Sequence, residues 1–267
     1  MRSYNFKYIL FVVTCIASIQ FSCSEKQPDI QPNKLRIAFK HQVDGQELKA
    51  NELIYQNAAG NPYEISEVMY FISDLVLYHS DGSIVKPDGW TDIHYVDSRI
   101  PTTMEWYCGN DIRAGFYKGI SFTFGIKSER NKSFMFVNPP EVNMAWPEVL
   151  GGGYHYLMIN GFWKDTLDER MPFNFHLGIG QIYENNSGQI ADITEFIDNS
   201  FTVEPNGEVF NVSEDGTTTI NLIMDINSWF ETPIIYNHNR FGGAIMQNQE
   251  AMNIGCMNGR DAFYVTN

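Results

Sequence analysis

The sequence predicts an all-β fold, an antiparallel β-sandwich of immunoglobulin-like or Greek-key type with long loops and one C-terminal helix. Two observations predict it. Apolar residues alternate along many short segments, the pattern of strands that bury one face. Sequences rich in Asp, Asn, Gly and Pro separate these segments and favour tight turns. The spacing is typical of a sandwich or barrel rather than of alternating strands and helices.

The predicted strands follow one another along most of the chain. In "LRIAFKH", Leu35, Ile37 and Phe39 share one face. The turn sequences are "VDGQ", "AAGNP", "SDGS", "PNGE" and "EDGT". The strands are expected at residues 35–41, 71–79, 121–126, 154–159, 172–180 and 218–226.

The segment "PFNFHLGIG" (172–180) has two unlike faces. One face is apolar and consists of Phe173, Phe175, Leu177 and Ile179. The other carries His176, and Gly178 and Gly180 leave room beside it. This strand therefore has one face for packing and one face free to carry a site.

One long helix is expected near the C-terminus, over residues 244–263. Ile245, Met252 and Cys256 fall roughly along one stripe of that helix. The Asn258-Gly259 pair is a plausible C-terminal stop.

The N-terminus has the layout of a secretory signal. Arg2 and Lys7 precede an apolar run that is too short to span a membrane. The sequence "QFSC" resembles a bacterial lipobox, with Cys23 as the lipidated residue, and a Ser and an acid follow as in surface-exported lipoproteins of Bacteroidetes. We therefore expect a signal peptide (1–22), a flexible tether (23–33) and one domain (34–267), anchored to either face of the outer membrane. Ordinary cleavage near Cys23, without lipidation, is the alternative.

The charge of the chain is strongly negative. The formal net charge is −14, from 18 basic and 32 acidic residues. Removing residues 1–22 takes away Arg2 and Lys7, which leaves 16 bases against 32 acids, a charge of −16. Phosphate backbones would repel such a surface, so nucleic acid is not an expected partner.

Two cysteines, Cys108 and Cys256, remain outside the signal and Cys23. An even count in an exported protein predicts a disulfide between them. Two reduced, buried thiols are the alternative.

Motifs of common enzymes are absent from the sequence. It contains no GxSxG, no HExxH, no Walker glycine loop and no CxxC. We therefore expect a protein that is not an enzyme, although a pair of catalytic carboxylates could be hidden among the scattered acids.

The histidines are more informative. His94 in "WTDIHYVD" and His176 in "FNFHLGIG" lie inside predicted strands, where a buried imidazole needs a partner. His155 follows a run of three glycines in "GGGYHYLMI" and is a further candidate. A structural role is the alternative for each. His41 is expected at the surface, and His238 in a loop that binds nothing.

The order of several segments resembles the MbnP-like family of exported bacterial proteins. No single segment is decisive, but together they cover nearly all of residues 35–265 in the same order. The segments are "IYQNAAGNPYEISEVMYFISDLVLYHSDG", "IHYVD", "GFYKGISFTFGIKSERN", "NMAWPEVLGGGYHYLMINGFW", "FNFHLG", "INLIMDINSWF" and "NGRDAFYV".

This resemblance implies a β-sandwich and an association with copper. By the resemblance, His94 and His176 match the family's histidines and would be the metal ligands. Two neutral imidazoles suit Cu(I). Relatives use a tryptophan oxidised to kynurenine, which makes Trp90 and Trp146 candidates, with His155 as another possible third ligand. The resemblance also implies a di-haem peroxidase-like protein or a TonB-linked receptor as partner.

Two functions are therefore expected from the sequence. The first is an exported, lipid-anchored protein that binds copper for uptake or storage without catalysing a reaction. The second is a surface lipoprotein that uses its aromatic residues, 14% of the chain, to bind a glycan or a partner protein. Neighbouring genes for copper handling or for glycan use would separate the two.

Overall fold

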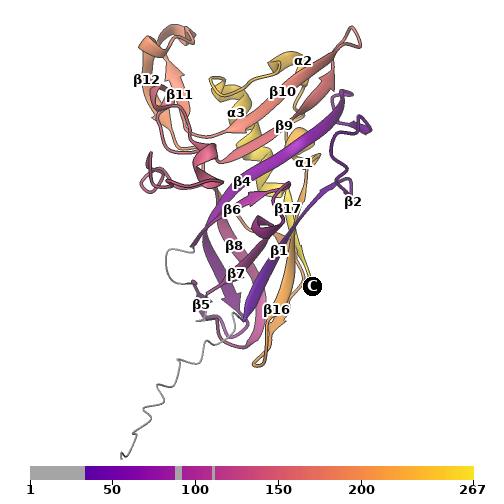
Figure 1. The fold of residues 1–267 in the computed structure, drawn as a ribbon, viewed down its shortest axis with the longest axis vertical. Coiled ribbons are helices and arrows are strands. Elements are labelled where there is room, and N and C mark those ends of the chain that lie inside the picture. Colours follow the sequence, from indigo (N-terminus) through magenta and orange to yellow (C-terminus); the bar gives the residue numbers. More distant parts are fainter. Residues whose placement is uncertain (1–33, 88–91, 110–111) are drawn as a thin grey trace, which may run out of the picture. The chain divides into compact units, whose positions relative to one another are not determined.

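The computed structural model describes residues 34–87, 92–109 and 112–267. The expected signal peptide and tether, Cys23 and Trp90 lie outside these residues. Two large sheets form the described part, which confirms the predicted all-β sandwich (Figure 1). None of the helices in these three ranges is long and apolar enough to cross a membrane.

The first sheet brings together the two ends of the described chain. β1 pairs in parallel with β16, so that Leu35 lies opposite Thr218 and Gln42 lies opposite Asp225. Parallel pairing needs a long connection, which the intervening chain supplies. The order of strands is β14 (Asn206–Gly207), β17 (Phe263–Thr266), β16 (Thr218–Asp225), β1 (Leu35–Val43) and β2 (Gln46–Glu47), with β7 (Glu105–Cys108) also beside β1.

The second sheet is built on one long strand, β4 (Pro62–His79). Its first half pairs with β9, its second half pairs with β8, and β6 lies along its other edge. The order is β10 (Arg170–Leu177), β9 (Leu157–Lys164), β4, β8 (Gly115–Phe124) and β13 (Phe201–Val203), with β3 (Tyr55–Gln56), β5 (Ile84–Val85) and β6 (Ile93–Asp97) beside β4 and β15 (Phe210–Val212) beside β8. A separate hairpin joins β11 (Gly180–Tyr183) to β12 (Ile193–Ile197).

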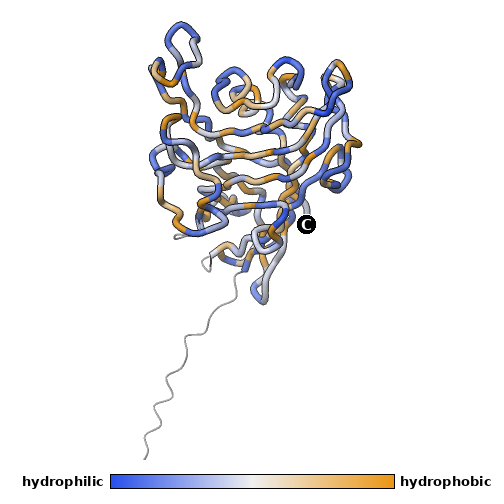
Figure 2. Tube along the Cα trace, turned by 45° about the horizontal axis from the view of Figure 1, so that its top comes forward, coloured by the Kyte–Doolittle hydropathy of each residue, from blue (hydrophilic) through white to orange (hydrophobic). Residues whose placement is uncertain are grey.

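The core has two neighbouring parts. Between the sheets, aromatic rings pack edge to face and in stacks, for example Phe39 and Phe124 against Tyr70. In the second part, the apolar face of β10, a strand of the second sheet, is covered by α1 (Ser228–Glu231), α2 (His238–Phe241) and α3 (Gln249–Asn258) (Figure 1). There Phe175 contacts Phe230. The loops at the top of Figure 2 are mostly hydrophilic, whereas the strands alternate.

The C-terminal helix is shorter than the sequence predicts. α3 ends at Asn258, as expected, but it begins only at Gln249. The side chain of Asn248 accepts a hydrogen bond from the backbone N–H of Ala251, which caps the helix at this point. Ile245 is buried, but it lies before the helix and not on its stripe.

The predicted disulfide between Cys108 and Cys256 is wrong, because both are free thiols. Cys108 lies opposite Leu35, at the end of the sheet where β16 begins. Cys256 lies in α3, shortly before β17, which meets the other end of β16. About 20 Å of strand separates these ends, whereas a disulfide needs Cα atoms within about 7 Å. Burial raises the pKa of the Cys256 thiol to about 12.

Candidate metal centre

His94 and His176 lie on opposite faces of the second sheet. His94 on β6 is opposite Ile72 of β4. His176 on β10 is opposite Met158, and Met158 is opposite Met69 of β4. Met69 and Ile72 are an odd number of residues apart, so they point to different faces. The predicted pairing of His94 with His176 in one metal site is therefore wrong.

His94 has a structural position between the two sheets. Its ring stacks between Phe39 and Trp106, with ring centres 5.1 Å away on each side. Its Nε2 donates a hydrogen bond to the carbonyl oxygen of Thr103 at 2.8 Å. Burial lowers the pKa of His94 to about 4, so the ring is neutral at pH 7.

The histidine that meets His176 is His155. Their rings contact edge to face, with centres 5.0 Å apart, and the two side chains lie on the outer face of the sheet under the 127–153 loop. His155 is 6% exposed and His176 is 7% exposed. His155 comes just before β9, where a bridge between Ala145 and Tyr154 ties the loop down. The sequence singled out both residues, but it could not show that they meet.

The hydrogen bonds of His155 fix its protonation. Its Nδ1 lies 2.9 Å from the backbone carbonyl oxygen of Met144. A carbonyl oxygen only accepts, so Nδ1 carries the proton and Nε2 keeps a lone pair. That Nε2 is buried and has no hydrogen-bond partner.

The hydrogen bonds of His176 also fix its protonation, but here the proton is on Nε2 and the lone pair is on Nδ1. Its Nε2 lies 2.7 Å from Oδ1 of Asn160, and Nδ2 of Asn160 donates to Glu67 at 2.6 Å. The amide oxygen of Asn160 therefore faces His176, so Nε2 carries the proton. Nδ1 keeps a lone pair, and it too is buried without a partner.

Two neighbouring rings thus each hold one buried, unpartnered lone pair. Leaving a buried polar atom unsatisfied costs about 1–3 kcal/mol. Protonation does not relieve that cost at pH 7, because burial lowers the pKa of His155 to about 4. Burial, together with the neighbouring His155, lowers the pKa of His176 to about 3. A metal ion that prefers neutral nitrogen donors fits this arrangement.

Trp146 forms one wall of this centre. Its ring centre lies 4.7 Å from that of His155, and its Nε1 donates to the carbonyl of Leu150 at 3.0 Å. Gly178 makes room for the ring, because a Cβ at this position would lie 2.5 Å from Trp146. The space that the sequence predicted beside His176 therefore exists, and the indole fills it.

The donor set restricts the choice of metal. Within residues 34–87, 92–109 and 112–267, no group of three or more His, Cys, Asp or Glu side chains could hold a metal ion together. A closed tetrahedral zinc site needs four such ligands. Two neutral imidazoles without a carboxylate suit the low coordination number of Cu(I) instead.

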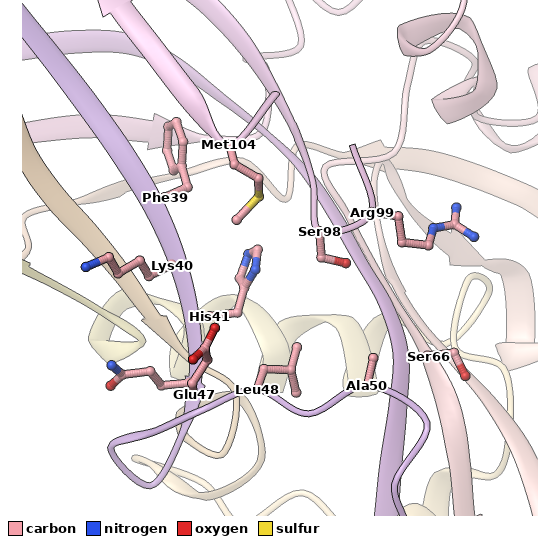
Figure 3. Close-up of a pocket in the computed structure, with 11 residues that line it drawn as sticks. Phe39, Lys40, His41, Glu47, Leu48, Ala50, Ser66, Ser98, Arg99 and Met104 are labelled. Atoms are coloured by element: carbon pink, nitrogen blue, oxygen red, sulfur yellow. The ribbon is translucent and has the colours of Figure 1, made fainter. Parts of the chain in front are cut away.

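A separate cavity of about 440 Å³ opens beside His41 (Figure 3). Glu47, Arg99 and Met104 contribute to its wall. His41 is buried, contrary to expectation, and burial lowers its pKa to about 4. His41 is the only histidine in this wall, so the cavity does not repeat the His155–His176 pair.

His238 is also buried, and aromatic rings surround it. Its Nδ1 accepts a hydrogen bond from the side-chain nitrogen of Asn57 at 3.1 Å, and its ring packs against Phe173 and Phe230. The sequence placed it in a loop and gave no sign of this role.

Comparison with known proteins gives one family and one fold. The chain matches the MbnP family over residues 32–257. The solved structure of MbnP from Methylosinus trichosporium is similar, with a TM-score of 0.53 and 13% sequence identity. The match covers 86% of this chain and 96% of that one, and at this identity it supports the fold alone. A search of curated proteins finds no match.

Proposed function

Because the chain belongs to the MbnP family, we propose that it is a copper-handling protein that binds Cu(I) through His155 and His176 without catalysing a reaction. This proposal keeps His176 from the sequence prediction and replaces His94 with His155. The observation that carries it is the pair of buried, unpartnered lone pairs on adjacent rings. Trp146 shields the pair from solvent on one side.

The chemistry of the two rings supports a soft, low-coordinate ion. Ring centres 5.0 Å apart are compatible with one ion that bridges two nitrogens at bonds of about 2 Å each. Because both rings are neutral, binding at pH 7 displaces no proton. The bound ion would satisfy both nitrogen atoms that the protein leaves without a partner.

A competition titration against a Cu(I) chelator tests the proposal. Wild type should bind one Cu(I) per chain. His155→Phe and His176→Phe should each weaken binding by more than about 100-fold, since the loss of an outer-shell partner alone typically costs 10–100-fold. His94→Phe is the control, because it changes a half-buried histidine on the other face, and it should bind as wild type does. Equal affinity in all four proteins would refute the site.

The proposal includes an anchor at Cys23, outside the described residues. Lipid attachment there would hold the domain at the outer membrane through a tether of about ten residues. Cys23→Ala should release the protein from the membrane fraction of its host. Retention of the Cys23→Ala protein in that fraction would show that the anchor is wrong.

A further inference from the structure

We infer that Asn160, Glu67 and Arg99 form a relay that holds the proton on Nε2 of His176 and thereby keeps Nδ1 open to a metal ion. The inference rests on the proposed function for its metal, but the relay itself concerns the metal-free protein. These three residues would be positioning residues, because they act through His176.

The relay is continuous in space. His176 Nε2 lies 2.7 Å from Asn160 Oδ1, and Asn160 Nδ2 lies 2.6 Å from Glu67 Oε1. The guanidinium group of Arg99 forms an ion pair with the other oxygen of Glu67. The Glu67 side chain is 17% exposed, whereas that of Arg99 is 60% exposed. The chain of contacts therefore runs from the buried histidine to the protein surface.

The backbone sets the relay in place. Asn160 of β9 lies directly opposite Glu67 of β4. An irregularity in the pairing between Ile65 and Glu67 sets this register. Asn160 and His176 lie on the same face of adjacent strands, because Met158 is opposite His176.

The direction of the relay follows from what each group can donate. A carboxylate that is paired with Arg99 only accepts hydrogen bonds, so Asn160 must turn its NH₂ group to Glu67. The amide oxygen must then face His176, and an oxygen acceptor requires the proton on Nε2. Glu67 therefore selects the tautomer of a ring that it does not touch.

Without that carboxylate, Asn160 would be free to rotate. Its NH₂ group could then donate to Nε2 of His176, and Nε2 would have to be the acceptor. The ring proton would move through solvent from Nε2 to Nδ1, with no change in charge. The lone pair at Nδ1 that the proposed function requires would be lost.

His155 has no such dependence. Its Nδ1 proton is held by a backbone carbonyl, that of Met144, which cannot exchange donor for acceptor. The same carbonyl also accepts from the backbone N–H of His155. One ligand is thus fixed by the backbone, whereas the other depends on three side chains.

The test uses Glu67→Gln, which keeps the shape of the side chain but lets it donate. In the metal-free protein, ¹⁵N spectra of labelled histidine should show the Nε2–H tautomer of His176 in wild type. In Glu67→Gln a large fraction should change to Nδ1–H, and Cu(I) affinity should fall about 10–100-fold. Glu105→Gln is the control, since Glu105 also pairs with an arginine, Arg36, but lies on β7 of the first sheet.

A second variant, Arg99→Gln, provides a test that does not depend on the folding of Glu67→Gln. Arg99 is exposed, so its replacement should not disturb the fold. It should shift the tautomer in the same direction by a smaller fraction. An unchanged His176 tautomer in both folded variants would overturn the relay. If wild type binds no Cu(I) while Glu67→Gln still changes the tautomer, the proposed function fails and the relay stands.

Discussion

Two histidine environments lie on the two faces of one sheet, and they differ in whether the ring nitrogens have hydrogen-bond partners. His94 is packed between two aromatic rings, and no buried nitrogen of it is left without a partner. His155 and His176 each have one. Burial lowers the pKa of His94 and of His155 to the same value, about 4. Burial and a shifted pKa therefore do not distinguish the two environments. What distinguishes His155 and His176 is that each has an unpartnered nitrogen and that their rings are in contact.

The largest expected effect is on folding stability and separates the two environments directly. His94→Leu should destabilise the metal-free protein by about 2–4 kcal/mol, because it removes the ring stack and leaves the carbonyl of Thr103 unpaired. His155→Leu should change stability by less than about 1 kcal/mol, because it removes an unsatisfied atom and Met144 keeps its backbone partner. Urea unfolding measures both. Equal losses of stability in the two variants would show that the two histidine environments do not differ in this way.

A smaller effect is expected at Trp146, the wall of the proposed Cu(I) site. Gly178→Ala would force its Cβ into the Trp146 ring and should cost about 1–3 kcal/mol. It should also change tryptophan fluorescence and weaken Cu(I) binding. Gly119→Ala is the matched control, since nothing lies within 4 Å of a Cβ at that position. Tight copper binding by Gly178→Ala would show that the indole does not shape the site.

The pH dependence of stability tests whether the buried histidines are neutral in the folded protein. A histidine with pKa about 4 in the folded protein has a pKa near 6.5 when unfolded, so only the unfolded chain binds a proton between these values. Stability should therefore fall as pH drops from about 6.5 to 4, by about 1.4 kcal/mol per pH unit for each such histidine. In urea unfolding at several pH values, His155→Leu should reduce the dependence of stability on pH by the contribution of one histidine. A slope equal to that of wild type would mean that His155 is protonated in the fold.

The sequence predicted the strands better than it predicted their neighbours. Alternation located β1 and β16, and it placed His176 opposite the apolar face of its own strand, because alternation depends only on nearby residues. It could not show that β9 lies between β4 and β10, or that β6 lies beyond β4. The order of these strands, together with the register of their pairing, decides which histidines share a face. His94, which the family resemblance assigns to the metal site, faces the interior between the two sheets.

The remaining differences have the same origin in long-range contacts. His155 meets His176 because the pairing of β9 with β10 continues beyond Leu157, where the backbone N–H of Tyr156 donates to the carbonyl of Leu177. Gly178 does provide space, but only the fold shows that Trp146 fills it. The even number of cysteines predicts a bond, but Cys108 lies at one end of the first sheet and Cys256 lies in α3, which precedes the strand at the other end. Composition carries no information on such separations.

The parallel pairing of β1 with β16 also bears on the order in which the protein can fold. Arg36 and Thr219 are neighbours in the sheet but 183 residues apart in the chain. During synthesis, β1 therefore emerges long before its partner and must wait for it with one edge unpaired. Pairings across such distances in sequence form slowly, because a large loop must close first. The first strand of the domain is thus among the last to gain its full set of hydrogen bonds.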